Sequence, residues 1–125
     1  MNNLDFVNPP HKESTVKISH PAIGEIYCLN EPEARATVRE IWIDDLYLQE
    51  GISLCTGDVV LDVGANIGVF TLYAAKQGAQ VYAYEPMPPT YAVLQQNIEA
   101  HGLGQLELKR KSWNLFRPRV VTTSR

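Results

Sequence analysis

The residues of this chain best suited to chemistry are two acids, each near the end of an apolar run, and the small residues of the turn between those runs. Asp62 lies in the run 59–63, and Glu85 ends the run 80–85. A strand ending in an acid, a tight glycine turn, a helix and a second strand ending in an acid form the layout of a nucleotide-binding βαβ unit. The residues that this layout assigns to cofactor binding are Asp62, Gly64, Ala65, Asn66, Gly68 and Glu85.

Glycine and asparagine give the turn its expected shape. Gly64 lets the chain reverse where a Cβ atom would block a ligand, so we expect the backbone amides there to be free to meet it. Gly68 falls in the first turn of the next helix, where a small residue permits close packing of helix on sheet. Asn66 is one of the few residues that tolerate a left-handed conformation.

The spacing of the glycines argues against a dinucleotide. The dinucleotide fingerprint reads G-x-G-x-x-G, and from Gly64 this chain has Asn66 and Val69 at the two later glycine positions. An NAD-dependent dehydrogenase half-domain would share Glu85 but would need those glycines. It stays an alternative.

The remaining pattern predicts an α/β fold with a parallel sheet. The run 59–63 shows no alternation of polar and apolar residues, which fits a strand covered on both faces. We expect strands at 24–29, 59–63, 80–85 and 106–108, and helices at 33–49, 67–77 and 90–101. Residues 1–23 are expected to form a partly disordered lead-in.

The turn resembles motif I of the class I S-adenosylmethionine-dependent methyltransferases, D/E-x-G-x-G-x-G. It matches at Asp62, Gly64 and Gly68, with Asn66 in place of the middle glycine. The string from Asp62 onward, D-V-G-A-N-I-G-V-F-T, is similar to the FkbM family in particular. The resemblance covers residues 24–108. It implies the N-terminal half of a Rossmann-like class I methyltransferase sheet, incomplete because the later strands are missing.

The resemblance also implies roles for the two acids. Asp62 would face the methionine amino group of S-adenosylmethionine, because a carboxylate complements an ammonium. Glu85 would accept hydrogen bonds from the two ribose hydroxyls, and it lies about 20 residues after the turn, the separation typical of such acids. The alternative is a structural role, with Asp62 as a cap of the turn or helix and Glu85 as a solvated charge.

The activity implied by the resemblance is methyl transfer by in-line displacement, mainly to a hydroxyl of a small molecule or a sugar. The protein would then align the acceptor oxygen and, where needed, remove its proton. No catalytic residue of this chain is assigned, since the family's later loops usually carry the substrate contacts and any general base. A non-catalytic truncated remnant or an interaction module is a further alternative.

Composition fits one domain. The chain has 125 residues, of which 45% are hydrophobic. No segment approaches the length needed to span a membrane, and we expect a cytoplasmic protein. Cys28 and Cys55 lack metal-ligand spacing and are expected to be free thiols buried in or beside the core, with a disulfide as the alternative, and no metal site is predicted. His101 is expected to contact the carbonyls at the end of its own helix.

The charge pattern changes at Lys109. All 14 acids fall in residues 1–108, whereas 109–125 contain six basic residues and no acid. We expect this tail to be a disordered, truncated or out-of-frame end, and a nucleic-acid-binding arm is the alternative. A sheet of about three strands would leave an exposed edge, so we also expect self-association.

Overall fold

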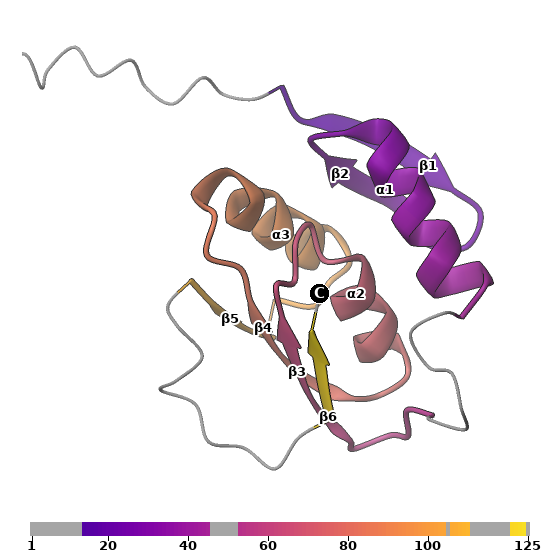
Figure 1. The fold of residues 1–125 in the computed structure, drawn as a ribbon, viewed down its shortest axis with the longest axis vertical. Helices are drawn as coiled ribbons and strands as arrows, with labels where there is room; N and C mark the ends of the chain where they lie inside the picture. The colour runs from indigo at the N-terminus through magenta and orange to yellow at the C-terminus, as the bar shows by residue number, and fades with distance from the viewer. Residues whose placement is uncertain (1–13, 46–52, 105, 111–120, 125) are drawn as a thin grey trace, which may run out of the picture.

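The computed structural model describes residues 14–45, 53–104, 106–110 and 121–124 (Figure 1). Along the chain, the elements are β1 (Val16–His20), β2 (Gly24–Cys28), α1 (Glu31–Val38), the π-helical turn η2 (Arg39–Ile43), β3 (Val59–Val63), α2 (Val69–Lys76), β4 (Gln80–Tyr84), α3 (Pro88–Ala100), β5 (Glu107–Lys109) and β6 (Val121–Ser124). None of the helices in these ranges is long and apolar enough to cross a membrane.

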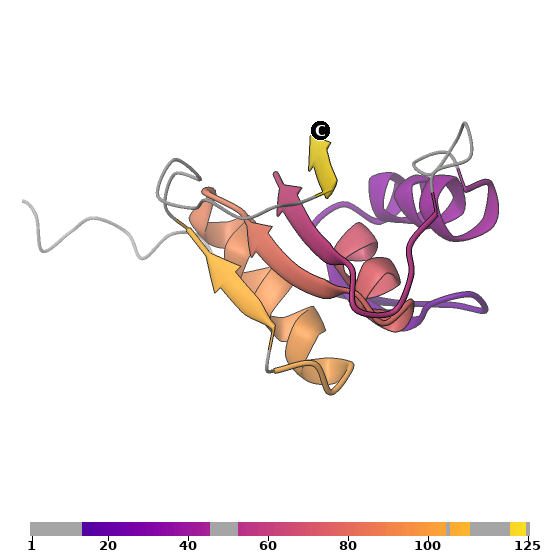
Figure 2. The same ribbon diagram turned by 90° about the horizontal axis from the view of Figure 1, so that it is seen from below.

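Four strands form a parallel sheet in the order β5-β4-β3-β6. α2 and α3 lie on the same face of this sheet, and the hairpin of β1 and β2 lies beyond them together with α1 (Figures 1 and 2). The α/β class predicted from the sequence is confirmed. The carboxyl ends of β3 and β4 lie side by side in this arrangement, with Val63 opposite Tyr84.

The core forms where the sheet meets the helices that cover it. β3 and β4 contribute Val60, Val81 and Ala83, and α2 and α3 contribute Phe70 and Leu94. Each of these side chains is at most 1% exposed. Burial of this apolar surface is the main stabilising contribution to such a unit, and it fixes the strand ends that carry the two acids.

Two helices begin at other residues than predicted, because of the residues at their N-termini. α2 begins at Val69 rather than at position 67, since Gly68 precedes it in a left-handed conformation with φ of 100°. α3 begins at Pro88 rather than at position 90. Proline fits the first turn of a helix because the N–H that it lacks would have no helical partner there.

The helix predicted at 33–49 begins earlier and changes its hydrogen bonding. α1 begins at Glu31, after the Asn30 side chain accepts a hydrogen bond from the Glu33 amide. Such a cap satisfies an amide that has no partner within the helix. The helical segment then continues through η2 to Ile43, and residues 46–49 lie outside the described part of the chain.

The strand β1 was not predicted, because residues 1–23 were expected to be a loose lead-in. β1 pairs antiparallel with β2, with Val16 opposite Cys28 and His20 opposite Gly24. Val16 and Ile18 alternate with Lys17 and Ser19, but this alternation extends over a strand of only five residues, of which Ile18 alone is buried. The hairpin leads directly into α1.

The strand β6 was not predicted either. The tail 109–125 contains the last residue of β5 and all of β6, while residues 111–120 lie outside the described ranges. β6 pairs with β3 on the side away from β4, with Val60 opposite Val121. β3 is therefore an inner strand of the sheet, and the described edges are those of β5 and β6.

Candidate functional site

The turn between β3 and α2 has an unusual backbone. Gly64, Asn66 and Gly68 have φ angles of 75°, 56° and 100°. Three left-handed residues at alternate positions produce a tight reversal that side chains with a branched Cβ would strain. Asn66, one of the few residues that tolerate this conformation, adopts it.

The amides of the turn bond within the protein, which corrects the prediction that they would be free. The N–H groups of Gly64 and Ala65 both donate to the carbonyl of Tyr84, at 2.9 and 2.8 Å. The N–H of Gly68 donates to the carbonyl of Ala65, at 3.0 Å. These bonds tie the turn to the end of β4 and leave those three amides unsuited to cradling a phosphate.

Glu85 is built into the turn rather than solvated. Its side chain is 6% exposed. One carboxylate oxygen accepts a hydrogen bond from the Asn66 amide at 2.9 Å, and the other accepts from the Met87 amide at 3.0 Å. Since each carboxylate oxygen has more than one lone pair, both can accept a further hydrogen bond. The reading of Glu85 as a solvated charge at a strand end is therefore wrong, and the carboxylate is held in one orientation beside Asn66.

Asp62 is fully buried, with 0% exposure. The Thr71 hydroxyl donates a hydrogen bond of 2.6 Å to it, which joins β3 to α2. The Asp62 carboxylate thus has no solvent-exposed surface in this arrangement. The predicted contact between Asp62 and a methionine amino group stays a prediction.

Gly68 allows a close approach, but to a helix rather than to the sheet. A Cβ atom at this position would lie 2.7 Å from Cδ1 of Leu94 on α3. Leu94 is completely buried in the core. Gly68 is therefore required both by its left-handed backbone and by the packing of α3 against the start of α2.

Asn97 is a residue of the site region that the sequence analysis missed. It is fully buried on α3. Its side-chain oxygen accepts from the Tyr27 amide at 2.7 Å, and its NH₂ group donates to the carbonyls of Tyr27 and Ile67 at 2.9 and 2.8 Å. It thus fixes the turn residue Ile67 to β2. The signal in the sequence is an amide side chain directly before Ile98, on the apolar side of the helix.

A cavity of about 430 Å³ lies between the turn, the end of β2 and α1. We call it the α1 cavity, and it is lined by Cys28, Leu29, Asn30, Glu33, Ala34, Thr37, Ala65, Asn66, Ile67, Val69 and Thr90. Among the described residues that line it, Glu33 is the one with a charged side chain. Asn66 lines this cavity, and its backbone amide also donates to Glu85, the acid that follows β4. Asn66 therefore connects the cavity with Glu85.

The histidine and cysteine predictions are met in part. His101 donates through Nε2 to the carbonyl of Glu25 at 2.8 Å, so it contacts β2 rather than the end of its own helix. Both cysteines are free, but Cys55 is exposed, which corrects its expected burial. Burial raises the pKa of the Cys28 thiol, as does the negative charge of Glu31. Among the described residues no cluster of histidine, cysteine or acidic side chains could hold a metal ion.

Known proteins similar in sequence are methyltransferases and a synthetase. No protein-family model matches the chain. The chain is 47% identical over 75 residues to the 31-O-demethyl-FK506 methyltransferase FkbM of Streptomyces tacrolimicus, a match that covers 58% of this chain and 29% of FkbM. It is 35% identical over 121 residues to the AMB antimetabolite synthetase AmbE of Pseudomonas aeruginosa, which covers 90% of this chain and 6% of AmbE. The chain thus spans less than a third of either relative.

The fold also has counterparts among solved structures. A SAM-dependent methyltransferase from Agrobacterium tumefaciens matches 78% of this chain and 32% of its own, with a TM-score of 0.52 and 18% identity. One from Aquifex aeolicus matches 68% of this chain and 48% of its own, with a TM-score of 0.52 and 21% identity. These likenesses show a Rossmann-like methyltransferase fold of which this chain covers a part.

Proposed function

We propose that this chain, a sequence relative of the FkbM-like class I methyltransferases, binds S-adenosylmethionine at the turn between β3 and α2 as part of a methyltransferase. The observation that carries the proposal is the setting of Glu85. Its carboxylate is 6% exposed and is oriented by two backbone amides, one of them from the turn itself. A fixed carboxylate with spare lone pairs is suited to accept hydrogen bonds from the two hydroxyls of a ribose.

The internal bonding of the turn favours S-adenosylmethionine over a dinucleotide. A dinucleotide carries a pyrophosphate, which needs amide donors at the glycine turn. In this chain the amides of Gly64, Ala65 and Gly68 donate to protein carbonyls, and that of Asn66 donates to Glu85. S-adenosylmethionine has a ribose but no phosphate, so it needs the acceptor that Glu85 supplies and does not need these four amides as donors.

The reaction we propose is O-methylation of a hydroxyl on a small molecule or a sugar. When bound, S-adenosylmethionine supplies an electrophilic methyl group on a positively charged sulfur. The contribution of this chain is to hold and orient the ligand through Glu85 and the turn, since alignment of the reacting atoms supplies much of the rate enhancement in such transfers. The name of the relative FkbM, a 31-O-demethyl-FK506 methyltransferase, supports a small-molecule hydroxyl as acceptor.

We also propose that the chain self-associates, through the edges of β5 and β6. β3 is paired on both sides, so the strands with an unpaired edge in the described sheet are β5 and β6. Unpaired strand edges present rows of N–H and C=O groups that can pair with another chain. Sedimentation at rising protein concentration tests this, and a monomer at every concentration would contradict it.

Isothermal titration of the 125-residue chain with S-adenosylhomocysteine tests ligand binding. NADH is the comparison ligand, because a dehydrogenase half-domain would bind it. We expect saturable binding of S-adenosylhomocysteine alone. Glu85→Gln removes a charged acceptor of two hydrogen bonds, so we expect about tenfold to 100-fold weaker binding. Glu99→Gln on the exposed face of α3 removes the same charge and serves as the control.

The other results identify the alternatives. Comparable binding of NADH would favour the dehydrogenase half-domain. No binding of either ligand, by a chain that circular dichroism shows to be folded, would overturn the proposal and leave a remnant or an interaction module. Equal affinity of wild type and Glu85→Gln for S-adenosylhomocysteine would mean that Glu85 does not bind the ligand, and would contradict the observation on which the proposal depends.

A further inference from the structure

The buried position of Asp62 raises the question of which group meets the amino acid end of the proposed ligand. S-adenosylmethionine and S-adenosylhomocysteine both carry an ammonium and a carboxylate beyond the sulfur. Asp62 is 0% exposed and bonds to Thr71 on the core side of β3. An acid with exposed surface beside the turn is therefore a second candidate to bind the ammonium.

The α1 cavity is the hollow that begins at the turn. Glu85 bonds to the amide of Asn66, and Asn66 also lines the cavity. A ligand whose ribose lies at Glu85 can therefore extend past Asn66 toward α1. A volume of about 430 Å³ is within the range of small-molecule sites and holds an amino acid side arm with room to spare.

The charge of the cavity selects what it can hold. Of the lining residues in the described part of the chain, Glu33 is the sole charged one. A cavity with one carboxylate and no cationic side chain favours an ammonium and disfavours an anion. The cavity also has neutral hydrogen-bond donors, the NH₂ group of Asn30 and the hydroxyl of Thr90, for a neighbouring carboxylate.

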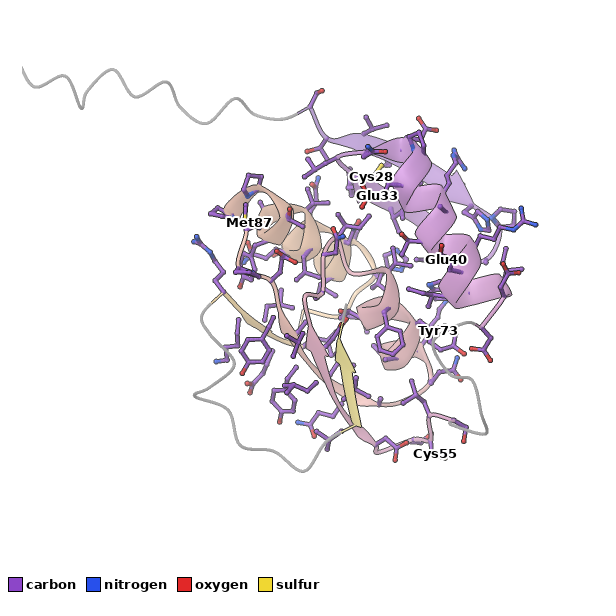
Figure 3. The ribbon with its side chains drawn as sticks, viewed as in Figure 1. Cys28, Glu33, Glu40, Cys55, Tyr73 and Met87 are labelled. Atoms are coloured by element: carbon purple, nitrogen blue, oxygen red, sulfur yellow. The ribbon has the colours of Figure 1, made fainter. Side chains whose placement is uncertain are left out.

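Glu33 differs from the other acid in the first turn of α1. Glu31 forms an ion pair with Arg35 at 3.1 Å, on the same helix. The Glu33 carboxylate has no hydrogen bond or ion pair with any of the described residues, although its backbone amide and carbonyl bond to Asn30 and Thr37. In the view of Figure 3, Glu33 and Cys28 both lie on the side of α1 that faces α3, and both line the α1 cavity. The helix therefore holds the base of Glu33 in place, and its charge remains available to a ligand.

We propose that the Glu33 carboxylate binds the ammonium group at the methionine end of the ligand, in the α1 cavity. The inference rests on the proposed function, because it takes S-adenosylmethionine as the ligand. Glu33 and Glu85 then bind two groups of one molecule, the ammonium and the ribose, on either side of Asn66. Glu33 is a binding residue in this assignment and takes no part in the bond changes.

The experiment compares two ligands that differ only in the amino acid arm. S-adenosylhomocysteine carries the ammonium, and 5′-methylthioadenosine keeps the adenosine and the thioether without it. Both are titrated calorimetrically into the 125-residue chain, its Glu33→Gln variant and its Glu31→Gln variant. Glutamine suits the third position of a helix about as well as glutamate, so Glu33→Gln keeps the start of α1 intact. Glu31→Gln removes the same charge from the same helical turn and is the matched control.

We expect Glu33→Gln to lower the affinity for S-adenosylhomocysteine about fivefold, the upper end for a solvent-accessible charge pair. The affinity for 5′-methylthioadenosine should not change. Glu31→Gln should change neither affinity. Loss of affinity for both ligands in Glu33→Gln would mean that the side chain shapes the site without meeting the ammonium, and would overturn the inference. Unchanged affinity of Glu33→Gln for both ligands would also overturn the inference. Binding of S-adenosylhomocysteine to the wild type would still support the proposed function in that case. No binding of either ligand to wild type would overturn both.

Discussion

Gly68 makes a quantitative prediction because two separate physical effects act at one atom. In Gly68→Ala the new Cβ would lie 2.7 Å from Cδ1 of Leu94, and the backbone at this residue has φ of 100°. Leu94 lies in the core with 0% exposure, so its methyl group cannot move aside without disturbing its neighbours. The substitution must therefore cost conformational strain and overpacking together.

The two costs can be separated with a second glycine. Left-handed backbone in an L-residue costs about 1–2 kcal/mol, and an extra methyl in a packed core costs about 1–3 kcal/mol. Gly68→Ala should therefore lower the free energy of unfolding by about 2–5 kcal/mol. Gly102 has φ of 71° and nothing within 4 Å of its Cβ position, so Gly102→Ala should show the backbone cost alone. The difference between the two variants measures the packing cost.

The assay is urea unfolding followed by circular dichroism, with unchanged m-values as the sign that the same transition is compared. Adding Leu94→Ala makes room for the new methyl group. The double variant should then be more stable than the sum of the two single changes predicts. A Gly68→Ala variant no less stable than Gly102→Ala would refute the reasoning, because it would mean that α3 yields to the methyl group at no cost.

Further predictions concern the buried acid and the thiols. Thr71→Val removes the hydroxyl that donates to the fully buried Asp62, and should lower the free energy of unfolding by about 1–3 kcal/mol. Thr37→Val removes a half-buried hydroxyl that donates to a carbonyl of its own helix, so it should change this free energy by much less, and equal effects in urea unfolding would contradict the assignment. At pH 8 a thiol reagent should modify Cys55 quickly, because that residue is exposed. Cys28 should react only after unfolding, because it is 0% exposed and its raised pKa leaves less thiolate at any given pH; two equally fast thiols would disprove this.

Much of the central βαβ unit could be predicted from the sequence because its signals are local. The strand predicted at 59–63 has those bounds in the structure, since its apolar run is ended by a glycine that reverses the chain. The left-handed conformation of Asn66 follows from its side chain, and the position of Glu85 follows from its distance along the chain. Each of these depends on neighbours in sequence.

What could not be predicted depends on parts of the chain that meet only in the fold. The amides of the turn are occupied because the carbonyl of Tyr84 comes to lie beside Gly64. Glu33 belongs to the candidate site because the hairpin places α1 beside the turn. The first strand of that hairpin, β1, was not predicted, and only one of its residues is buried. No spacing within the sequence reports such contacts.

The bonds from α3 to β2 have a consequence for how this protein comes apart. A two-stranded hairpin is marginally stable by itself in water. Here Asn97 pairs with both backbone groups of Tyr27, and His101 bonds to the carbonyl of Glu25. The hairpin is thereby made part of the same cooperative unfolding unit as the parallel sheet, with which it shares no strand. The residues of the turn, β2 and α1 that line the α1 cavity are then expected to separate only when the whole domain unfolds. The cavity should therefore keep its shape for as long as the domain stays folded.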